Sequence, residues 1–400
     1  MTTISRDVVG GVDTHADAHH VAVLDTAGRR LGDAAFPATA SGYAALLTFL
    51  ISFGALLRVG VEGTGSYGAG LARYLRGQGV EVAEVIRPNR QTRRMQGKSD
   101  PIDAYAAAAT ALAEPDLPVP KTADGAIEAI RQLMVARRSA VKARTAAQVQ
   151  IKTLLVTAPE SVRAKYRGMT DNTLIPALSR SRGSDDASVE ATLRALRSLA
   201  RRHQHLTVEI VDLDEALERL VTTANPALAA TKGIGPVTGA QLLVTAGDNP
   251  DRLRSESAFA ALCGVSPIPA SSGKTTRHRL NRGGDRHANA ALHRIALVRM
   301  SYEQRTRDYV ARKRTEGRST REIIRCLKRA IAREIFTLLT KPVRTPQIDD
   351  LRPLRHARGI SLETAAQHFG VWPMKISSIE RGKRRDDDFA TTYRAWLLTA

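Results

Sequence analysis

Two short aliphatic runs that each end in an acid set the strongest limit on how this chain folds. The first covers residues 8–14 and carries Asp13, and the second, LLRVGVE at 56–62, ends in Glu62. Further strand-like runs occupy residues 20–25, 30–36 and 80–86, and helical patterns occupy 43–53 and 68–77. Strands that first meander and then alternate with helices predict a mixed sheet with helices on its faces.

A second pair of acids, Asp100 and Asp103, lies at the expected start of a helix. Asp100 precedes Pro101, which suits the first helical turn, and Asp103 follows one turn later on the same side. Taken alone, the pair has an ordinary explanation, because capping and first-turn acids are common at helix starts. Four acids at one sheet edge would repel each other unless cations neutralised them. Two divalent ions about 4 Å apart would do so and would suit phosphoryl transfer.

Histidines and cysteines give no separate metal site. We interpret His15, His19 and His20 as structural, because they lie at a strand–turn–strand junction where helical ligand spacing does not apply. Cys263 and Cys326 lie in apolar-periodic segments and form neither a disulfide framework nor a zinc pattern.

The net charge of +20 predicts a polyanionic partner, for which nucleic acid is the usual candidate. An anionic membrane is the competing partner. However, no apolar run approaches the ~20 residues of a membrane-spanning helix. The N-terminus has no signal layout, and no aromatic basic amphipathic helix is evident. We expect a soluble protein of a reducing compartment that does not bind membranes.

The stretch SPIPASSGKTTRHRLNRGGDRHANAAL, residues 266–292, combines hydroxyls, glycines and many cations. Ser272 directly precedes Gly273, and such a hydroxyl suits attack on phosphate, because glycine admits backbone N–H groups and arginine binds oxyanions. The alternative is a basic loop that only grips a nucleic-acid backbone. Besides Ser271, the predicted nucleic-acid contacts are cations of this loop and of the one before Asp100: Lys274, Arg277, Arg279, Arg282, Arg286, Arg90, Arg93, Arg94 and Lys98.

The segments GVDTH, GVEGTGSYG and KSDPIDA, in that order, resemble the RuvC-like domain of DEDD-type insertion-sequence transposases, the insertion-sequence one-ten family. The serine loop resembles the second domain of that family, and the resemblance spans roughly residues 8 to 340. It implies that Asp13, Glu62, Asp100 and Asp103 bind Mg²⁺, two ions per site. It also implies that Ser272 is the nucleophile that becomes covalently linked to DNA.

The same resemblance implies a recombinase that cuts and rejoins DNA, excises its element as a circle and inserts it at chosen targets. It further implies guidance by a structured RNA from the element, a bridge RNA. The expected assembly is a homo-oligomer, a dimer or tetramer, in which one subunit's acids complete a site with another subunit's serine. The expected location is the prokaryotic cytoplasm, at the nucleoid.

Beyond the strand–helix region, a proline-marked linker at 115–121 precedes two long helical patterns at 126–156 and 189–221. They predict a coiled-coil arm, which serves either subunit pairing or packing within one chain. The segment KGIGPVTGA that follows resembles a helix-hairpin-helix turn, in which Gly233 and Gly235 would let backbone N–H groups meet a phosphate. The alternative for these glycines is an ordinary tight turn.

The tail from residue 351 is not accounted for by the family pattern and looks like a helix-turn-helix of the Cro/repressor kind. Gly370 makes the turn, and the next helix begins at Trp372-Pro373. Its start would face base edges through Lys375, Ser377 and Ser378, next to Met374. The alternative is a small helical bundle for dimerisation.

The predicted fold class is therefore α/β plus all-α. The expected domains are a RuvC-like catalytic domain at 1–115, a coiled-coil arm at 122–222, a mostly helical serine domain at 223–340 and a helix-turn-helix at 349–400. Two other functions compete with the recombinase. One is a RuvC-like structure-specific endonuclease that uses water, and the other is a non-enzymatic DNA-binding regulator.

Overall fold

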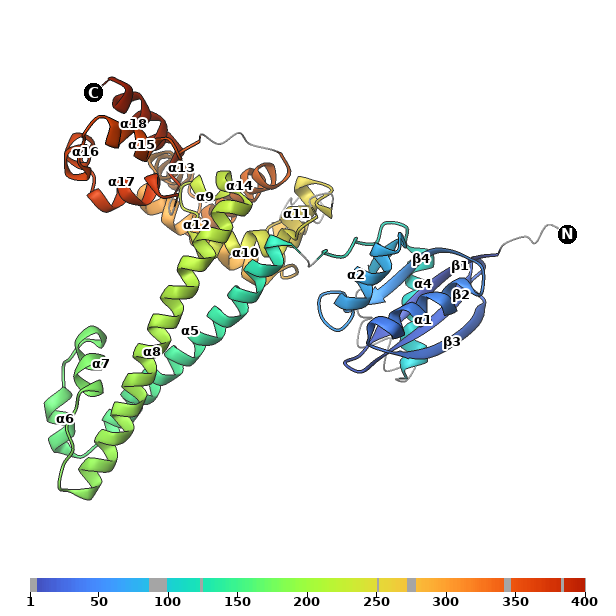
Figure 1. Ribbon diagram of the computed structural model, residues 1–400, viewed down its shortest axis with the longest axis horizontal. Helices are drawn as coiled ribbons and strands as arrows, with labels where there is room; N and C mark the ends of the chain where they lie inside the picture. The colour runs from blue at the N-terminus through green and yellow to red at the C-terminus, as the bar shows by residue number, and fades with distance from the viewer. Residues whose placement is uncertain are drawn as a thin grey trace. The chain divides into compact units, whose positions relative to one another are not determined.

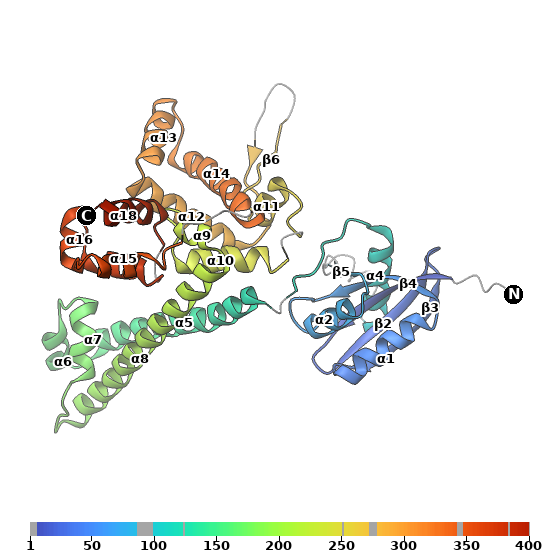
Figure 2. The same cartoon turned by 45° about the horizontal axis from the view of Figure 1, so that its top comes forward.

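The computed structural model describes residues 6–85, 99–122, 125–249, 252–271, 278–341, 347–382 and 385–399. The chain divides into two compact units, which are described separately. The first consists of Met1–Gly125 with Ala246–Arg254, and the second of Ala126–Thr245 with Ser255–Ala400. Most elements of both units are labelled in Figures 1 and 2. Among the residues described, no helix has the length and apolar character needed to cross a membrane.

The first unit is built on a five-stranded sheet in the order β3-β2-β1-β4-β5. β1 pairs antiparallel with β2, and β2 with β3, whereas β1–β4 and β4–β5 are parallel. The mixed sheet predicted from the sequence is thus confirmed. The strands are β1 (Asp7–Thr14), β2 (Ala18–Asp25), β3 (Arg30–Pro37), β4 (Ala55–Glu62) and β5 (Val82–Val85).

Helices cover both faces of this sheet, as the alternation of strands and helices predicts. The helices α1 (Ala40–Ile51) and α2 (Ala69–Gly77) pack on one face, where Leu50 and Leu71 share a core with Val12. The helix predicted from residue 43 begins earlier because the Thr39 hydroxyl caps it by accepting the Gly42 N–H at 3.2 Å.

The helix α4 (Asp100–Ala113) covers the other face and lies unusually close to β1. A Cβ added to Gly11 would come within 2.0 Å of the Ala108 backbone nitrogen and 2.3 Å of the Ala104 carbonyl oxygen. Gly60 of β4 meets α4 in the same way, at Ala107. Only glycine leaves room for this approach, so the sequence of β1 and β4 dictates how closely α4 lies on the sheet.

The second unit contains the predicted long helices, α5 (Ala126–Thr157) and α8 (Ala187–Ala224), which pack along each other (Figure 1). Packing of the two helices within one chain is therefore observed. Between them lie two short helices that the sequence analysis missed, α6 (Glu160–Tyr166) and α7 (Asp171–Ser179). Both bury apolar residues against the far part of the arm, in one core with Ile151, Leu178 and Leu196.

The rest of the second unit is almost entirely helical. Its longest helix after the arm, α14, begins with a capping box between Ser319 and Glu322. The elements before the tail are α9 (Pro226–Ala230), α10 (Pro236–Ala246), α11 (Glu256–Leu262), β6 (Ile268–Pro269), β7 (His278–Arg279), α12 (Arg286–Tyr302), α13 (Gln304–Thr315) and α14 (Thr320–Thr340).

The tail forms a small bundle around a buried polar cluster. Glu380 accepts a hydrogen bond from Arg355 Nε at 2.7 Å and another from the Tyr393 hydroxyl at 2.8 Å, all in the core. Gly370, with φ of 62°, ends one helix where the turn is predicted. The bundle comprises α15 (Leu351–Ala357), α16 (Leu362–Phe369), α17 (Pro373–Glu380) and α18 (Asp387–Thr399).

Candidate active site

Two of the predicted acids leave neighbouring parallel strands at the same edge of the sheet. Val12 of β1 is in register with Val61 of β4. Asp13 and Glu62 are the next residues along the two strands, so they lie beside each other. Side chains alternate between the faces of a strand, and Gly11 and Gly60 meet α4. Asp13 and Glu62 therefore project toward α4, and both are buried, with exposures of 2% and 6%.

The first turn of α4 supplies the other two acids, but in different surroundings. Asp103 is buried, with an exposure of 6%, whereas the Asp100 side chain is 53% exposed. Burial raises the pKa of the Asp13 carboxyl, and the charges of Glu62 and Asp103 raise it further. His15 acts in the opposite direction. The structure thus brings Asp13 together with Glu62 and Asp103, and leaves Asp100 at the exposed rim.

His15 joins this cluster, which the sequence analysis did not anticipate. Its Nε2 lies 3.1 Å from Asp13 Oδ2 and 3.3 Å from Asp100 Oδ1. A signal was present in the sequence, because residues i and i+2 at the end of a strand share a face. His15 therefore follows Asp13 toward α4, and it links the buried acids to the one at the rim.

The donors suit a divalent cation. One ligand atom each from Asp13, His15 and Asp100 lie within 4.8 Å of one another. Carboxylate oxygens are preferred by hard cations such as Mg²⁺, and an imidazole also suits Mn²⁺ or other transition metals. The pKa of Asp13 is raised mainly by burial and further by the charges of Glu62 and Asp103, and a bound cation would offset both effects.

The serine loop belongs to the second unit, and its central part lies outside the described residues. That part includes Ser272, Lys274 and Arg277. The predicted contacts of the loop before α4 also lie outside them: Arg90, Arg93, Arg94 and Lys98. Of the remaining loop positions, Ser271, Arg279, Arg282 and Arg286 are all exposed.

The base of the serine loop is firmly tied to the helices around it. β6 and β7 pair antiparallel, and Gly284, with φ of 82°, lets the chain turn tightly against the end of α11. Asp285 then caps α12 through the backbone N–H groups of His287 and Ala288 and accepts the Thr245 hydroxyl at 2.7 Å. Although burial opposes it, these hydrogen bonds lower the pKa of the Asp285 carboxyl, which is therefore an anionic anchor.

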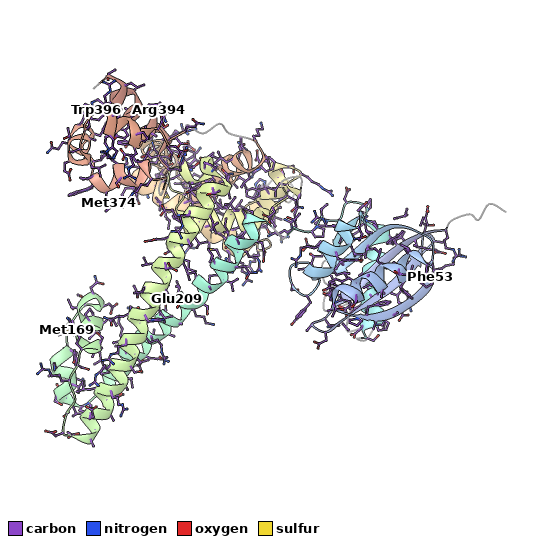
Figure 3. All side chains as sticks on the ribbon, viewed as in Figure 1. Phe53, Met169, Glu209, Met374, Arg394 and Trp396 are labelled. Carbon is purple, nitrogen blue, oxygen red and sulfur yellow. The ribbon has the colours of Figure 1, made fainter. Side chains whose placement is uncertain are left out.

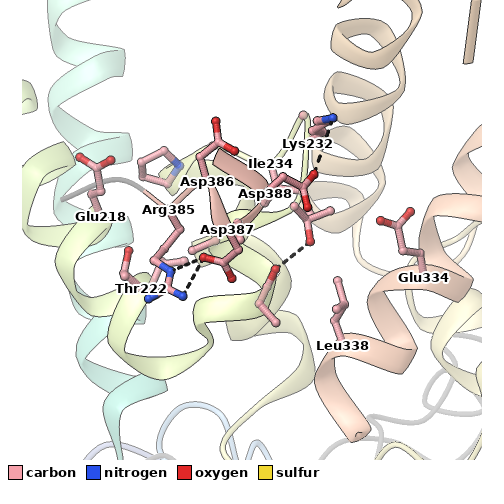
Figure 4. Close-up of a pocket in the computed structure, with 18 of the residues that line it drawn as sticks. Glu218, Thr222, Lys232, Ile234, Glu334, Leu338, Arg385, Asp386, Asp387 and Asp388 are labelled. Carbon is pink, nitrogen blue, oxygen red and sulfur yellow. Dashed lines mark hydrogen bonds and ion pairs between the residues drawn. The ribbon is translucent and has the colours of Figure 1, made fainter. Parts of the chain in front are cut away.

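The predicted hairpin turn lies between α9 and α10, and Gly233 within it has φ of 83°. Arg299 holds the turn by donating from Nε to the Lys232 carbonyl at 2.8 Å, and it pairs with Glu334 at 2.7 Å. The turn lines a cavity of about 940 Å³ (Figure 4), and Lys232 Nζ lies 4.0 Å from Asp388 across it. Six carboxylates are among the residues of the other walls: Glu218, Glu303, Glu334, Asp386, Asp387 and Asp388.

The predicted base-reading positions of the tail differ in how free they are. Lys375 Nζ lies 3.0 Å from Asp386 Oδ2 and 4.5 Å from the Phe389 ring centroid, so its amine is engaged inside the bundle. Ser377 and Ser378 are half-buried. Met374, labelled in Figure 3, is 68% exposed at the start of α17.

Comparison with known proteins bears on both units. A transposase family model of the IS110 DEDD type matches residues 10–158, and the transposase IS116/IS110/IS902 family matches residues 225–311. The chain thus contains two regions that are similar to IS110-type transposase domains. The first match contains the acid cluster, and the second contains the hairpin turn and the serine loop. The tail lies outside both transposase matches.

Relatives from two insertion elements support the same grouping. An uncharacterized 42 kDa protein of insertion element IS900 from Mycobacterium paratuberculosis is 28% identical over 144 residues, which is 35% of this chain and 36% of the relative. A 43.6 kDa protein of insertion element IS110 from Streptomyces coelicolor is 27% identical over 158 residues, 39% of this chain and 38% of the relative. The chain thus matches little more than a third of the length of each.

Proposed function

We propose that this protein is a metal-dependent DNA transposase that cuts and rejoins the strands of an insertion sequence. The observation that carries the proposal is the convergence of Asp13, Glu62 and Asp103 on one buried sheet edge inside the IS110-type DEDD domain, with Asp100 and His15 at its rim. Buried acids that repel each other oppose folding unless a cation or a proton neutralises them, and this favours a metal site.

The acid cluster would hold the divalent cation, for which Mg²⁺ is our proposal, with two ions per site. When bound, the metal polarises the scissile phosphodiester and helps to offset the charge that develops on its oxygens. The residues of the chain fix the donors. Burial under α4 keeps water from the Asp13 and Glu62 carboxylates, and the contacts of His15 orient the Asp13 and Asp100 side chains.

Ser272 is the nucleophile in this proposal. Its Oγ attacks the scissile phosphorus, and the new Ser–O–P bond replaces the bond from phosphorus to the departing DNA oxygen. That oxygen takes a proton and leaves as a hydroxyl, while the serine proton is lost to a base. Attack by a DNA hydroxyl on the phosphoserine then reverses the exchange, so no external energy source is needed.

Metal removal tests the proposal. The full chain, incubated with duplex DNA that carries the ends of its element and with Mg²⁺, is expected to form a covalent protein–DNA adduct, seen as a shifted band on a denaturing gel. EDTA should abolish the adduct, and excess Mg²⁺ should restore it, because the acid cluster cannot act without its cation. Adduct formation at an unchanged level in EDTA would contradict the proposal.

A structured RNA and a second copy of the chain are the further partners that we propose. The family resemblance supports both, and the net charge of +20 supports the RNA. Sequencing the nucleic acid that co-purifies with the full chain would identify the RNA. Recovery of only random fragments would count against it.

For the tail we propose binding to a fixed DNA sequence, such as an end of the element. The helix–turn–helix order of α16 and α17, with Gly370 between them and Met374 exposed, supports this. Deleting residues 346–400 is expected to lower affinity for that sequence by at least about tenfold, measured by competition against random duplex. Unchanged sequence preference after the deletion would assign the tail to packing or dimerisation instead.

A further inference from the structure

A polar cluster on β3 lies beside the acid cluster. The carboxylate of Asp33 has two partners from different elements. His20 Nε2 of β2 lies 2.8 Å from Asp33 Oδ2, and the Tyr105 hydroxyl of α4 donates to Asp33 Oδ1 at 3.2 Å. The guanidinium of Arg30 lies 4.5 Å from the centre of the Tyr105 ring and covers it. The cluster therefore ties the beginning of α4 to β2 and β3.

Two residues of this cluster are close to the acid site along the backbone: His20, which pairs with Asp13, and Tyr105, which lies on the same helix as Asp103. His20 is the residue directly opposite Asp13 in the antiparallel pairing of β1 and β2, so the two side chains lie on the same face. Tyr105 follows Asp103 by two residues on α4. A displacement of Tyr105 is thus passed to Asp103 within one helical turn.

The position of α4 on the sheet needs two kinds of contact. The close approach at Gly11 sets how near α4 lies to β1, because backbone meets backbone there. The alanines of α4 that face the sheet, Ala104, Ala107 and Ala108, are buried, and their methyl groups make no directional bonds to it. At the N-terminal end of α4, the hydrogen bond from Tyr105 to Asp33 adds a directional constraint to the contact between His15 and Asp100.

We infer that Asp33, His20 and Tyr105 form a positioning clamp that fixes the Asp103 carboxylate relative to Asp13 and Glu62. The clamp residues do not bind the metal; they act through the placement of α4. Residues that hydrogen-bond a metal ligand directly commonly change metal affinity by about 10–100-fold when they are replaced. The clamp acts one step further away, through the helix, so we expect an effect at the lower end of that range. This inference rests on the metal site proposed above.

The test measures metal binding rather than catalysis. Mn²⁺ is titrated into the full chain without nucleic acid, and the free ion is followed by electron paramagnetic resonance. Tyr105→Phe, which removes one oxygen and keeps the ring under Arg30, is expected to raise the Mn²⁺ dissociation constant about tenfold. Asp33→Asn should raise it as much or more, because both His20 and Tyr105 lose their anionic partner.

A matched control separates positioning from general damage. Tyr74→Phe removes the same atom from a half-buried tyrosine of α2, on the opposite face of the sheet, and is expected to leave Mn²⁺ affinity unchanged. Urea unfolding of Tyr105→Phe should remain a single cooperative transition, which excludes general unfolding as the cause of weaker Mn²⁺ binding. Wild-type Mn²⁺ affinity in both Tyr105→Phe and Asp33→Asn would overturn the clamp.

Asp13→Asn distinguishes failure of the clamp from failure of the metal site. If Asp13→Asn loses Mn²⁺ binding while Tyr105→Phe and Asp33→Asn keep it, the metal site stands and the clamp falls. If Asp13→Asn also binds Mn²⁺ like the wild type, the metal site itself is wrong, and the clamp falls with it.

Discussion

Replacing Asp13 by asparagine is expected to lower the rate of DNA strand cleavage by about a thousandfold or more, because the substitution removes the most central of the charged donors. The same substitution should not destabilise the metal-free protein. Burial and the charges of Glu62 and Asp103 raise the pKa of the Asp13 carboxyl, so the ionised carboxylate destabilises the metal-free folded state. A neutral amide relieves that repulsion.

The two effects are measured separately, by a cleavage assay on labelled duplex and by thermal unfolding in EDTA. Thermal unfolding in Mg²⁺ gives a third observable. The wild-type protein should gain stability on adding the ion, and Asp13→Asn should gain much less, since a ligand stabilises only the state that binds it. The expected pattern is therefore lost activity at equal or higher metal-free stability.

Asp25 provides the matched control, because it is also a buried acid at the end of a strand. Its carboxylate accepts the backbone N–H of Arg29 at 2.9 Å and that of Ala27 at 3.0 Å, and these bonds and the Arg29 side chain lower its pKa. Asp25→Asn should therefore lower stability and spare cleavage, the reverse of Asp13→Asn. Cleavage by Asp13→Asn at the wild-type rate, or equal losses in both variants, would remove the acid cluster from the mechanism.

The sheet and its acids were predictable because their signals are local. The apolar runs place Asp13 and Glu62 at strand ends, and Pro101 marks the helix start that carries Asp100 and Asp103. The parallel pairing of β1 and β4, which sets Asp13 beside Glu62, came from the structure. The roles assigned to these residues came from the family resemblance. The residue pattern alone also allowed an ordinary helix cap and ordinary strand ends.

Other features could not be read from the sequence because they join distant segments. Asp33 and Tyr105 are 72 positions apart, and no periodicity relates them. The hairpin turn was predicted to meet phosphate or to be an ordinary tight turn, and its place in a cavity lined also by six carboxylates, some of them from the tail, could not be foreseen. His15 was within reach of sequence reasoning, since it shares a strand face with Asp13, but helical ligand spacing was the wrong criterion at a strand end.

Replacing Ser272 by alanine is expected to abolish the covalent protein–DNA adduct completely. The effect is all-or-none because the proposed intermediate contains a bond to the serine oxygen, and alanine has no atom that can replace it. Binding of Mn²⁺ should be unchanged, because the acids lie in the first unit and the serine loop in the second. Ser271→Ala, one position earlier in the same loop, is the matched control: it removes a predicted nucleic-acid contact but not the proposed nucleophile, so an adduct should still form.

The same pair of variants separates the recombinase from its two rivals. A nuclease that activates water needs the acids but not the serine. In that case Ser272→Ala would cleave at the full rate, and neither the wild-type protein nor the variant would form an adduct. A DNA-binding regulator would show no cleavage in any variant and no dependence on Mg²⁺. Only a serine recombinase loses strand exchange both in Asp13→Asn and in Ser272→Ala while it loses metal affinity in the first alone. The two substitutions therefore test whether residues of both units act in one reaction, because Asp13→Asn removes a metal ligand and Ser272→Ala removes the nucleophile.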